Sequence, residues 1–491
     1  MSAECLVLAL KVMTPQLSLK ADMSISTLEK NIETKMTAAG VAAPTITAFL
    51  GALRRVIAGE RGMVPEIEVD AVPSLPRLDD ISEPLPGSEQ LLKQLVVVKL
   101  NGGLGTGMGL ESAKSLLPVK GGDTFLDFIA LQILQLRTTT GSHEPGFYLM
   151  NSFSTQNETL AYLRKYSSLT AGEAIDFLQN MAPKIDAKTF EPVTWPAQPD
   201  LEWCPPGHGD IFPALVGSGL LDRLLARGIK YMFVSNSDNL GATVDLKLLQ
   251  YFASEDLSFL MEVAERTGAD RKGGHLAQRK STGRLLLREL AQCPQEDEPH
   301  FQNIERHRFF NTNNLWIRLD RIKAELERNG GALPLPLITN SKTVDPRDPS
   351  STKVLQLESA MGAAIECFDK SGAVVIPRTR FAPVKTTSDL LVLRSDACRV
   401  TEDHRLILVE ERAGSPPLVD LDPKFYKLLQ DFERYFAAGS PSLIRCDSLR
   451  IRGPVAFAKG VTCEGKVEFI NSSAETRIVP AGQYRNQTVH L

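Results

Sequence analysis

The stretch Leu95-Val-Val-Val-Lys-Leu-Asn-Gly-Gly-Leu-Gly-Thr-Gly-Met-Gly-Leu110 carries the strongest local signal in this chain. An apolar run typical of a buried strand leads directly into a loop that holds five glycines. Glycine lets backbone N–H groups converge on an anion without interference from a Cβ atom, and a following helix N-terminus would add a favourable dipole. Lys114 comes shortly after the loop, on or beside that predicted helix. The pattern therefore predicts a phosphate-binding loop rather than a simple turn.

Two well-known phosphate loops do not match this stretch. A Walker loop requires G-x-x-x-x-G-K-[ST], and no glycine of the chain precedes Lys-Ser or Lys-Thr. The dinucleotide fingerprint G-x-G-x-x-G is broken at Met108 and again at Leu110. The next predicted strand ends at Asn151, where a dinucleotide-binding fold carries an acidic residue for the ribose. A nicotinamide-dependent oxidoreductase is therefore disfavoured.

Short apolar runs alternate with helical patterns around this loop. We predict strands over residues 95–100, 147–150, 231–235 and 257–263, with helices over 124–137 and 220–227 between them. This alternation is typical of an α/β fold with a Rossmann-like mixed or parallel sheet and helices on both faces. Ligands of such sheets bind beyond the carboxyl ends of the strands.

The two flanks of this α/β region have different patterns. Residues 28–61 have helical periodicity around a Gly-Val-Ala-Ala-Pro break, and five prolines between residues 65 and 87 indicate an extended connector. From about Leu443, short β-branched runs punctuated by glycine and asparagine predict a small all-β tail, interpreted as a β-helix. We therefore divide the chain into an N-terminal helical segment and connector (1–85), a catalytic domain (86–400) and a C-terminal domain that ends in a β-helix (401–491).

Composition excludes several classes of protein. The chain has 491 residues, and 55 Lys and Arg against 59 Asp and Glu give a net charge of −4. This balance argues against a partner such as nucleic acid or an anionic membrane. No apolar run approaches the ~20 residues that span a bilayer.

The expected location is the cytoplasm. Residues 5–10 are apolar but lack the basic region and cleavage site of a secretory signal. Seven scattered cysteines without a C-x-x-C pair indicate free thiols in a reducing compartment. The C-terminal tripeptide Val489-His-Leu491 resembles a peroxisomal address but lacks a small first residue, so a peroxisome-like organelle is the alternative.

Four further segments carry candidate binding residues. In Trp203-Cys-Pro-Pro-Gly-His-Gly-Asp210, glycines on both sides leave His208 room to approach a ligand. Tyr231-Met-Phe-Val-Ser-Asn-Ser-Asp-Asn-Leu-Gly241 is a strand with a polar end, where Asp238 is a good ligand for Mg²⁺ if phosphate oxygens complete the shell. Phe309-Phe-Asn-Thr-Asn-Asn-Leu-Trp316 places amides that suit sugar hydroxyls in an apolar stretch. Arg378-Thr-Arg-Phe-Ala-Pro-Val-Lys-Thr386 places Lys385 after a rigid apolar segment.

Together these motifs resemble the UTP–glucose-1-phosphate uridylyltransferases, also called UDP-glucose pyrophosphorylases, of eukaryotic type. The resemblance is carried by Lys99-Leu-Asn-Gly-Gly-Leu-Gly-Thr-Gly-Met-Gly109, Pro205-Pro-Gly-His-Gly-Asp210, Ser235-Asn-Ser-Asp-Asn239, Lys272-Gly-Gly-His275, Arg288-Glu289, Phe310-Asn-Thr-Asn-Asn-Leu-Trp316 and Phe381-Ala-Pro-Val-Lys-Thr386. Their order and spacing match from about residue 90 to 400, and they are closest to the members from single-celled parasites.

The resemblance implies a fold, a reaction and a set of site residues. The fold is a Rossmann-like sugar-nucleotidyltransferase core with a C-terminal β-helix, and some members associate through that tail. The reaction is UTP + glucose 1-phosphate ⇌ UDP-glucose + pyrophosphate with Mg²⁺, by direct in-line displacement. The resemblance assigns Leu100, Asn101, Gly102, Gly103, Gln179 and Gly207 to the nucleotide; His208, Asn236, Gly274, Glu289, Asn311 and Asn313 to the sugar phosphate and glucose; Asp238 to the metal; and Lys114 and Lys385 to catalysis at the phosphates.

Two alternatives remain open from the sequence. One is a UDP-sugar pyrophosphorylase of broader sugar tolerance, including the N-acetylhexosamine type. The other is a non-catalytic protein that binds UDP-sugars. A pyrophosphate-release assay across several sugar 1-phosphates distinguishes all three functions.

Overall fold

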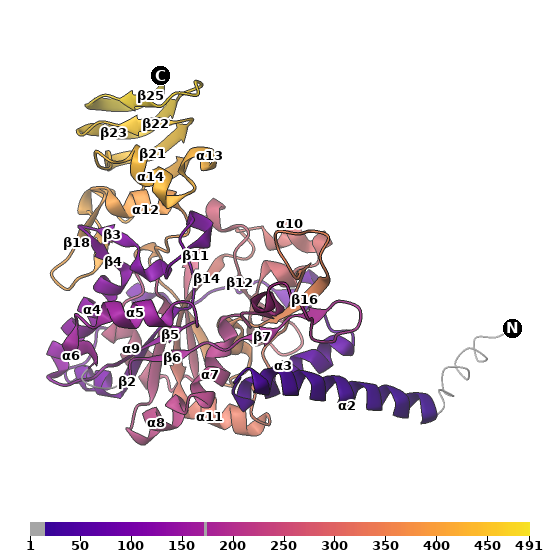
Figure 1. Ribbon diagram of the computed structural model, residues 1–491. Coiled ribbons are helices and arrows are strands. Elements are labelled where there is room, and N and C mark those ends of the chain that lie inside the picture. Colours follow the sequence, from indigo (N-terminus) through magenta and orange to yellow (C-terminus); the bar gives the residue numbers. More distant parts are fainter. Residues whose placement is uncertain (1–14, 171–173) are drawn as a thin grey trace.

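The computed structural model describes residues 15–170 and 174–491 (Figure 1). Within these two ranges, no helix combines the length and the apolar character needed to cross a bilayer. Six of the seven cysteines lie in the described part of the chain and are free thiols, as predicted. Cys5 and the apolar residues 5–10 lie outside the described residues.

The N-terminal segment is helical, as the periodicity predicts. Helix α2 (Pro15–Ala38) ends before the Gly-Val-Ala-Ala break, and α3 (Ala43–Ile57) begins with Pro44 in its first turn. Buried residues of both helices form one apolar cluster with Ile185, Leu337 and Leu357. The helical segment is therefore packed onto the body of the protein along α3, while the start of α2 projects from it (Figure 1).

The centre of the molecule is a mixed sheet whose main path runs β1-β12-β14-β10-β2-β5-β6. Strands β10, β2, β5 and β6 are mutually parallel, whereas β14 is antiparallel to β10 and β11. The strands are β1 (Val69–Asp70), β2 (Leu95–Asn101), β5 (Gly146–Asn151), β6 (Asp176–Leu178), β10 (Tyr231–Asn236), β11 (Phe259–Glu265), β12 (His275–Arg279), β13 (Leu285–Arg288), β14 (Phe309–Arg318) and β17 (Ser371–Val375).

Helices cover both faces of this sheet because alternate residues of the buried strands point to opposite sides. Leu95 and Val97 of β2 belong to the apolar cluster that includes α4 and α9, whereas Val96 and Val98 belong to the cluster with α7, α8 and α11. The helices of the body are α4 (Phe125–Thr140), α5 (Gln156–Leu163), α6 (Ser167–Thr170), α7 (Ile211–Gly217), α8 (Leu220–Ala226), α9 (Leu246–Ser254), α10 (Glu298–Phe301), α11 (Leu319–Arg328) and α12 (Thr387–Arg394).

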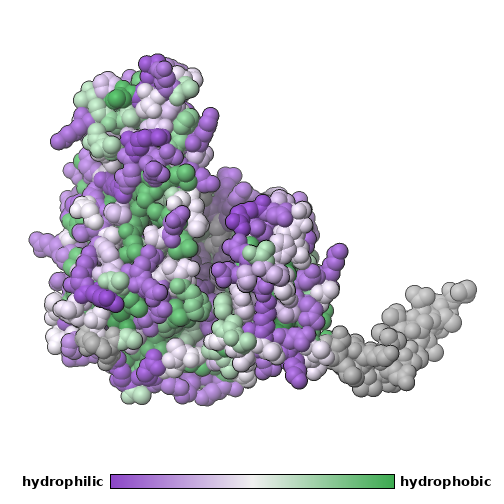
Figure 2. All heavy atoms as spheres, viewed as in Figure 1, coloured by the Kyte–Doolittle hydropathy of each residue, from purple (hydrophilic) through white to green (hydrophobic). Residues whose placement is uncertain are grey.

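Several small sheets surround the central one. Strands β15 (Ile338–Thr343), β16 (Lys353–Glu358) and β8 (Ile185–Asp186) form a three-stranded sheet beside α3. Strand pairs are formed by β3 (Pro118–Lys120) with β4 (Asp123–Thr124), β7 (Ala182–Pro183) with β9 (Trp203–Cys204), and β18 (Cys398–Val400) with β19 (Leu406–Leu408). Figure 2 shows a hollow between the side of the molecule that carries the C-terminal tail and the lobe that carries β16 and α10.

The C-terminal tail is built from parallel strands. After α13 (Pro423–Tyr426) and α14 (Leu429–Tyr435), the strands β20, β21, β23 and β25 form one parallel sheet, and β22 pairs in parallel with β24. Their bounds are β20 (Leu418–Leu421), β21 (Ser442–Arg452), β22 (Val455–Phe457), β23 (Val461–Ile470), β24 (Arg477–Val479) and β25 (Gly482–His490). Strand β23 joins two of the short β-branched runs of the predicted tail, residues 461–463 and 467–470, and its pairing with β21 and β25 shifts in register around Gly465. Apolar residues of the tail belong to the same buried cluster as α4 and β2, so the tail is packed on the body.

Candidate active site

The glycine loop leaves β2 and folds back on itself before the chain continues. Leu104 forms an isolated antiparallel bridge with Ala113, and the Lys114 N–H donates to the Gly103 carbonyl at 3.2 Å. Gly103 and Gly107 are exposed, and a Cβ atom at either position would meet no atom within 4 Å. The backbone around both glycines is therefore open to a bound group.

One prediction about this loop is wrong. Lys114 begins a single 3₁₀ turn (Lys114–Leu116), and the next α-helix, α4, begins only at Phe125. The bridge between Leu104 and Ala113 uses the residues that would otherwise start a helix. The groups that the loop offers to an anion are therefore backbone N–H groups and the Lys114 ammonium, not the N-terminus of a helix.

Lys114 is paired with Asp238 at the end of the neighbouring strand. Its Nζ donates to Asp238 Oδ2 at 2.5 Å, and both side chains are largely buried, with exposed fractions of 17% and 18%. Asp238 Oδ1 is buried and has no hydrogen-bond partner. The two residues meet because β10 and β2 are adjacent and parallel, so that their carboxyl ends lie at one edge of the sheet.

The predicted nucleotide residues lie together on one side of this pair. A Cβ atom on Gly102 would lie 2.6 Å from Gln179 Oε1, and Gln179 Nε2 donates to the Gly207 carbonyl at 3.4 Å. Leu100 accepts the Ser237 N–H through its carbonyl. The buried Asn101 side chain donates to Asn151 Oδ1 at 2.7 Å, so only the backbone of Asn101 is available to a ligand.

His208 is held in one tautomer by its surroundings. The Met361 N–H donates to His208 Nδ1 at 2.9 Å, so the ring proton resides on Nε2. Burial lowers the pKa of His208 to about 4, which keeps the imidazole neutral near pH 7. His208 can therefore act as a neutral hydrogen-bond donor through Nε2.

The predicted sugar residues form a second group on the other side of the pair. A Cβ atom on Gly274 would lie 2.5 Å from Glu289 Oε1, and the Asn311 N–H donates to the Gly274 carbonyl at 3.0 Å. Asn311 and Asn313 bond to each other at a register shift between β11 and β14, where Asn313 has a left-handed φ of 59°. Such bulges redirect side chains near binding sites. Asn236 ends β10 and is partly exposed.

Lys385 lies on the sugar side of the site. Its side chain is exposed, whereas its backbone N–H donates to Asp389 Oδ2 at 2.8 Å at the start of α12. Burial raises the pKa of Glu289, and the nearby Lys385 ammonium opposes that rise. The structure thus brings Lys385 and Glu289 within electrostatic reach of each other.

The strand order arranges these groups in a line along one edge of the sheet. From one end, Gly274 directly precedes β12 and Asn311 lies in β14. Asp238 follows β10, β2 leads to the loop with Lys114, and β6 leads to Gln179 beyond. Because β14 is antiparallel to β10, the N-terminal end of β14 lies at this edge. A ligand with a phosphate in its centre, a base at one end and a sugar at the other matches this order.

Comparison with known proteins agrees with this arrangement. The family model described as UTP–glucose-1-phosphate uridylyltransferase matches residues 48–464. The chain belongs to this family. It is 40% identical to the UTP–glucose-1-phosphate uridylyltransferase of Solanum tuberosum over 443 residues, which cover 89% of this chain and 90% of the relative. It is also 40% identical to that of Encephalitozoon cuniculi over 405 residues, covering 82% of this chain and 79% of the relative.

Solved structures of similar proteins have the same fold. The UDP-glucose phosphorylase of Trypanosoma brucei is 51% identical with a TM-score of 0.86, over 95% of this chain and all of that one. The UDP-glucose pyrophosphorylase of Leishmania major, described in open and closed structures, is 45% identical with a TM-score of 0.89, over 95% of this chain and 99% of that one. These relatives support the parasite-like character that the motifs indicate.

A buried polar network, which none of the sequence motifs revealed, lies beneath this uridylyltransferase site. Glu262, fully buried in β11, accepts two hydrogen bonds from Arg380, at 3.0 Å from Nε and 2.8 Å from Nη2. Asn239 Oδ1 accepts the Ala382 N–H at 3.0 Å, and its Nδ2 donates to Asn314 and to the Arg380 carbonyl. This network attaches the segment that leads to Lys385 to the end of β10. A charged residue inside the apolar run Phe259-Leu-Met-Glu-Val-Ala-Glu265 was the signal that could have revealed it.

A metal ion at this uridylyltransferase site would need ligands from the substrate. Among the described residues, no group of three or more His, Cys, Asp and Glu side chains could hold a metal ion. Of the acidic residues assigned to the site, Asp238 has a buried carboxylate oxygen without a hydrogen-bond partner, and Mg²⁺ is commonly held by one or two carboxylates together with phosphate oxygens and water. The residues present therefore fit a magnesium ion that arrives with a nucleotide.

Proposed function

We propose that this protein transfers uridylyl from UTP to glucose 1-phosphate and releases UDP-glucose and pyrophosphate. The observation that carries the proposal is the Lys114–Asp238 pair between the nucleotide group around Gln179 and the sugar group around Glu289. This is the reaction named for the family to which the chain belongs. A crystal structure of the Leishmania major relative, with one substitution, is a complex with UDP-glucose.

The proposed step is a single in-line displacement. A phosphate oxygen of glucose 1-phosphate attacks the α-phosphorus of UTP, and the bond from that phosphorus to the bridging oxygen of the β-phosphate breaks. The electron pair leaves with pyrophosphate, and the attacking oxygen is already ionised near pH 7, so no general base is required. Catalysis then depends on positioning and on neutralising charge.

The chain's own residues have distinct parts in this proposal. Lys114 neutralises charge at the phosphates of UTP and Lys385 does so from the sugar side, while His208 Nε2–H donates to a phosphate oxygen. Leu100, Asn101, Gly102 and Gly103 contact the uracil through their backbone, next to the Gln179 amide and Gly207. Asn236, Gly274, Glu289, Asn311 and Asn313 orient the sugar phosphate and the glucose hydroxyls. Asp238 would hold Mg²⁺ through Oδ1, and that ion when bound would offset negative charge on the phosphates.

A pyrophosphate-release assay with UTP and a panel of sugar 1-phosphates tests the function. We expect release with glucose 1-phosphate and little with galactose 1-phosphate or N-acetylglucosamine 1-phosphate. Comparable rates with all three would favour the broader UDP-sugar pyrophosphorylase. No release with any of them, together with normal UTP binding, would favour a non-catalytic UDP-sugar-binding protein.

We also infer that the C-terminal tail is a short β-helix through which copies of the chain associate. The parallel pairing of β20, β21, β23 and β25, with a second parallel pair β22–β24 beside it, supports the β-helix. Strand β25 forms the edge of its sheet and is mostly exposed, and such an edge can pair with another chain. Light scattering on the full chain and on a variant with Thr488→Pro in β25 tests this association.

The division of the chain at residues 85 and 400 and the cytoplasmic location also remain proposals. Limited proteolysis tests the two boundaries. A fluorescent protein fused to the N-terminus, which leaves Leu491 free, distinguishes the cytoplasm from a peroxisome-like organelle.

A further inference from the structure

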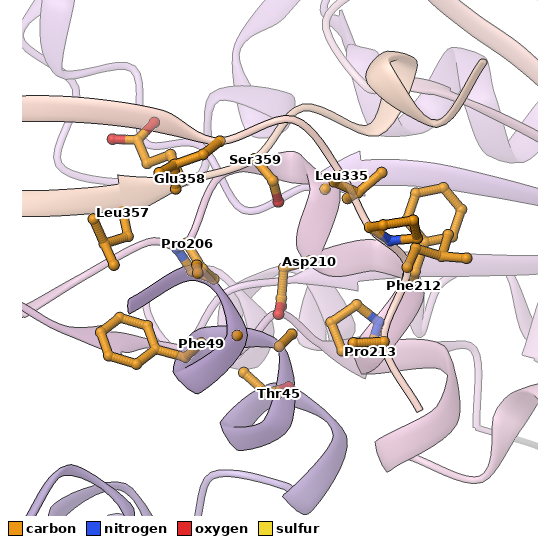
Figure 3. Close-up of a pocket in the computed structure, with 18 of the residues that line it drawn as sticks. Thr45, Phe49, Pro206, Asp210, Phe212, Pro213, Leu335, Leu357, Glu358 and Ser359 are labelled. Carbon is orange, nitrogen blue, oxygen red and sulfur yellow. The ribbon is translucent and has the colours of Figure 1, made fainter. Parts of the chain in front are cut away.

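A second cavity lies behind the segment that carries His208. It has a volume of about 280 Å³ and is enclosed by α3, α7, the loop that follows α11 and the end of β16. Its apolar wall consists of Phe49, Phe212, Pro213, Leu335 and Leu337 among others (Figure 3). An apolar cavity of about 150 Å³ is already large enough to bind benzene. This cavity therefore has room for a small organic molecule.

Three polar side chains from different elements converge on the middle of this cavity. Figure 3 shows Asp210, Thr45 and Ser359 directed into it from the start of α7, from α3 and from beyond β16. Asp210 and Thr45 are each only 3% exposed. The Thr45 hydroxyl is buried without a hydrogen-bond partner. Buried polar groups are normally paired, so this hydroxyl indicates a missing ligand or donor.

The charges of the lining favour a cationic ligand. Asp210 is the acidic side chain directed into the cavity, whereas the Glu358 carboxylate points away from it and accepts from Asn340 at 2.9 Å (Figure 3). Arg55 is the single basic residue among the described residues that line the cavity. Arg55 is already paired with Glu60 and donates to the Leu335 carbonyl at 2.7 Å. Asp210 accepts hydrogen bonds from the Asn180 backbone and side chain, which leave lone pairs of its carboxyl oxygens free.

We propose that this cavity binds a small amphiphile that has a protonated amine at Asp210 and an aromatic or aliphatic body against Phe49 and Phe212. The Thr45 hydroxyl accepts from the same amine. Burial raises the pKa of Asp210 to about 7, and a neighbouring ammonium would stabilise its ionised form. None of the residues that we assign to the nucleotide or to the sugar lines this cavity.

The cavity is connected to the nucleotide side of the site through short contacts. Asp210 is bonded to Asn180, the neighbour of Gln179, and Gln179 in turn donates to the Gly207 carbonyl. On the other wall, Ser359 accepts the Gly209 N–H at 2.9 Å and donates its own N–H to Pro206 at 3.0 Å. A Cβ on Gly207 would lie 2.4 Å from the Ser359 carbonyl oxygen, so the two segments are tightly packed. A ligand that moves Asp210 or Ser359 therefore shifts the residues that we assign to uracil.

Binding is tested on the full chain with benzylamine as the probe and benzyl alcohol as its neutral analogue, by calorimetry or ligand-observed NMR. We expect benzylamine to bind with a Kd on the order of 1 mM and benzyl alcohol at least tenfold more weakly. Asp210→Asn should remove this preference. Ala52→Leu, which fills the cavity from α3, should abolish binding of both, whereas Thr47→Leu on an exposed face of α3 should not. Equal benzylamine affinity in Ala52→Leu and the unmodified chain, or displacement of benzylamine by UTP in direct competition, would overturn the proposed site.

The kinetic part of this inference rests on the proposed function. Saturating benzylamine should change KM for UTP at least twofold while leaving kcat within a factor of two, and Ala52→Leu should remove the effect. Binding without any change in KM would overturn the connection to the nucleotide side. A chain that bound benzylamine but released no pyrophosphate would refute the proposed function and leave the cavity as a binding site.

Discussion

Lys114 and Asp238 form an ion pair of 2.5 Å that joins the glycine loop to the end of β10. Each residue compensates the buried charge of the other, because both side chains are largely removed from water and an unpaired buried charge lowers the stability of the fold. The pair also sets the position of the Lys114 ammonium relative to the open backbone at Gly103.

Lys114→Met should lower kcat/KM by about 100-fold or more, because it removes a preorganised cation and leaves the Asp238 carboxylate facing a triphosphate. Steady-state pyrophosphate release measures the loss. Lys370→Met, which removes a surface partner of Asp256, is the matched control and should be close to neutral. If Lys114→Met kept normal activity, Lys114 would have no place at the phosphates.

Lys385→Ala should lower kcat strongly, by about 100-fold, with UTP binding largely retained. The reason is that Lys385 lies near Glu289 and directly follows Val384, whose N–H donates to the Asp238 carbonyl at 3.2 Å, so we expect it at the reacting phosphates rather than at the uracil. Turnover and calorimetric UTP titration measure the two effects separately. Lys459→Ala, an exposed lysine of the tail, is the control. Equal loss of UTP affinity and turnover would instead place Lys385 at the nucleotide.

Asp238→Ala should weaken the apparent affinity for Mg²⁺ in turnover, since it removes the one buried carboxylate oxygen of the site that lacks a partner. A magnesium titration at fixed UTP measures the shift, which we expect to be about tenfold or more toward higher concentration. Binding of Mn²⁺ with UTP, followed by electron paramagnetic resonance, provides a readout independent of activity. An unchanged titration in both experiments would exclude Asp238 as a metal ligand.

Gly102→Ala and Gly274→Ala should have opposite substrate effects, and each variant serves as the control for the other. The new Cβ at residue 102 would displace the Gln179 amide, whereas that at residue 274 would displace the Glu289 carboxylate. Each substitution therefore changes the backbone position itself and also displaces a neighbouring side chain of the site. We expect Gly102→Ala to raise KM for UTP about tenfold and Gly274→Ala to raise KM for glucose 1-phosphate by a similar factor. The reverse pattern would show that the nucleotide and sugar assignments of the two groups have to be exchanged. An unchanged KM for both substrates in both variants would show that neither glycine lies at a binding site.

Acid should destabilise the folded protein through His208. Its pKa is about 4 in the folded chain and near 6.5 when unfolded, so between these values the unfolded chain binds more protons. Stability is therefore lost as pH falls through about 6.5. The His208→Asn side chain can still accept the Met361 N–H through Oδ1 but does not titrate. Between pH 7 and about pH 5, this variant should therefore lose roughly 1 to 2 kcal/mol less of its free energy of unfolding than the unmodified chain. Denaturant unfolding at pH 7 and pH 5 measures this difference, and parallel losses in both proteins would contradict it.

Much of the central fold follows from local pattern. The apolar runs that end in Asn101, Asn151 and Asn236 are parallel strands of one sheet, as predicted, because a short continuous apolar run with a polar end is a local property. The helix predicted over residues 124–137 is present as α4, but it does not begin at the glycine loop, because the Leu104–Ala113 bridge forms there between residues whose pairing no local pattern specifies.

The sequence predicts which residues belong to the candidate site, but not which of them contact each other. The motifs named Lys114 and Asp238 separately, and nothing in either motif shows that they pair. The Glu262–Arg380 interaction joins residues 118 positions apart, so its members look like isolated charges along the chain. The cavity behind His208 is assembled from segments that are distant in the chain, and the sequence motifs include only the one that ends at Asp210.

By itself, the sequence determined the family, the glycine loop and the residue types of the site, because each of these is contained in a short contiguous segment. Only the tertiary structure decided which charges face each other and which are left without a partner. It placed Asp238 beside Lys114, Gln179 against Gly102 and Glu289 against Gly274. The physical reason is that these contacts depend on the order of strands in the sheet. That order is set by packing of the two apolar faces between distant segments rather than by the residues that make the contacts.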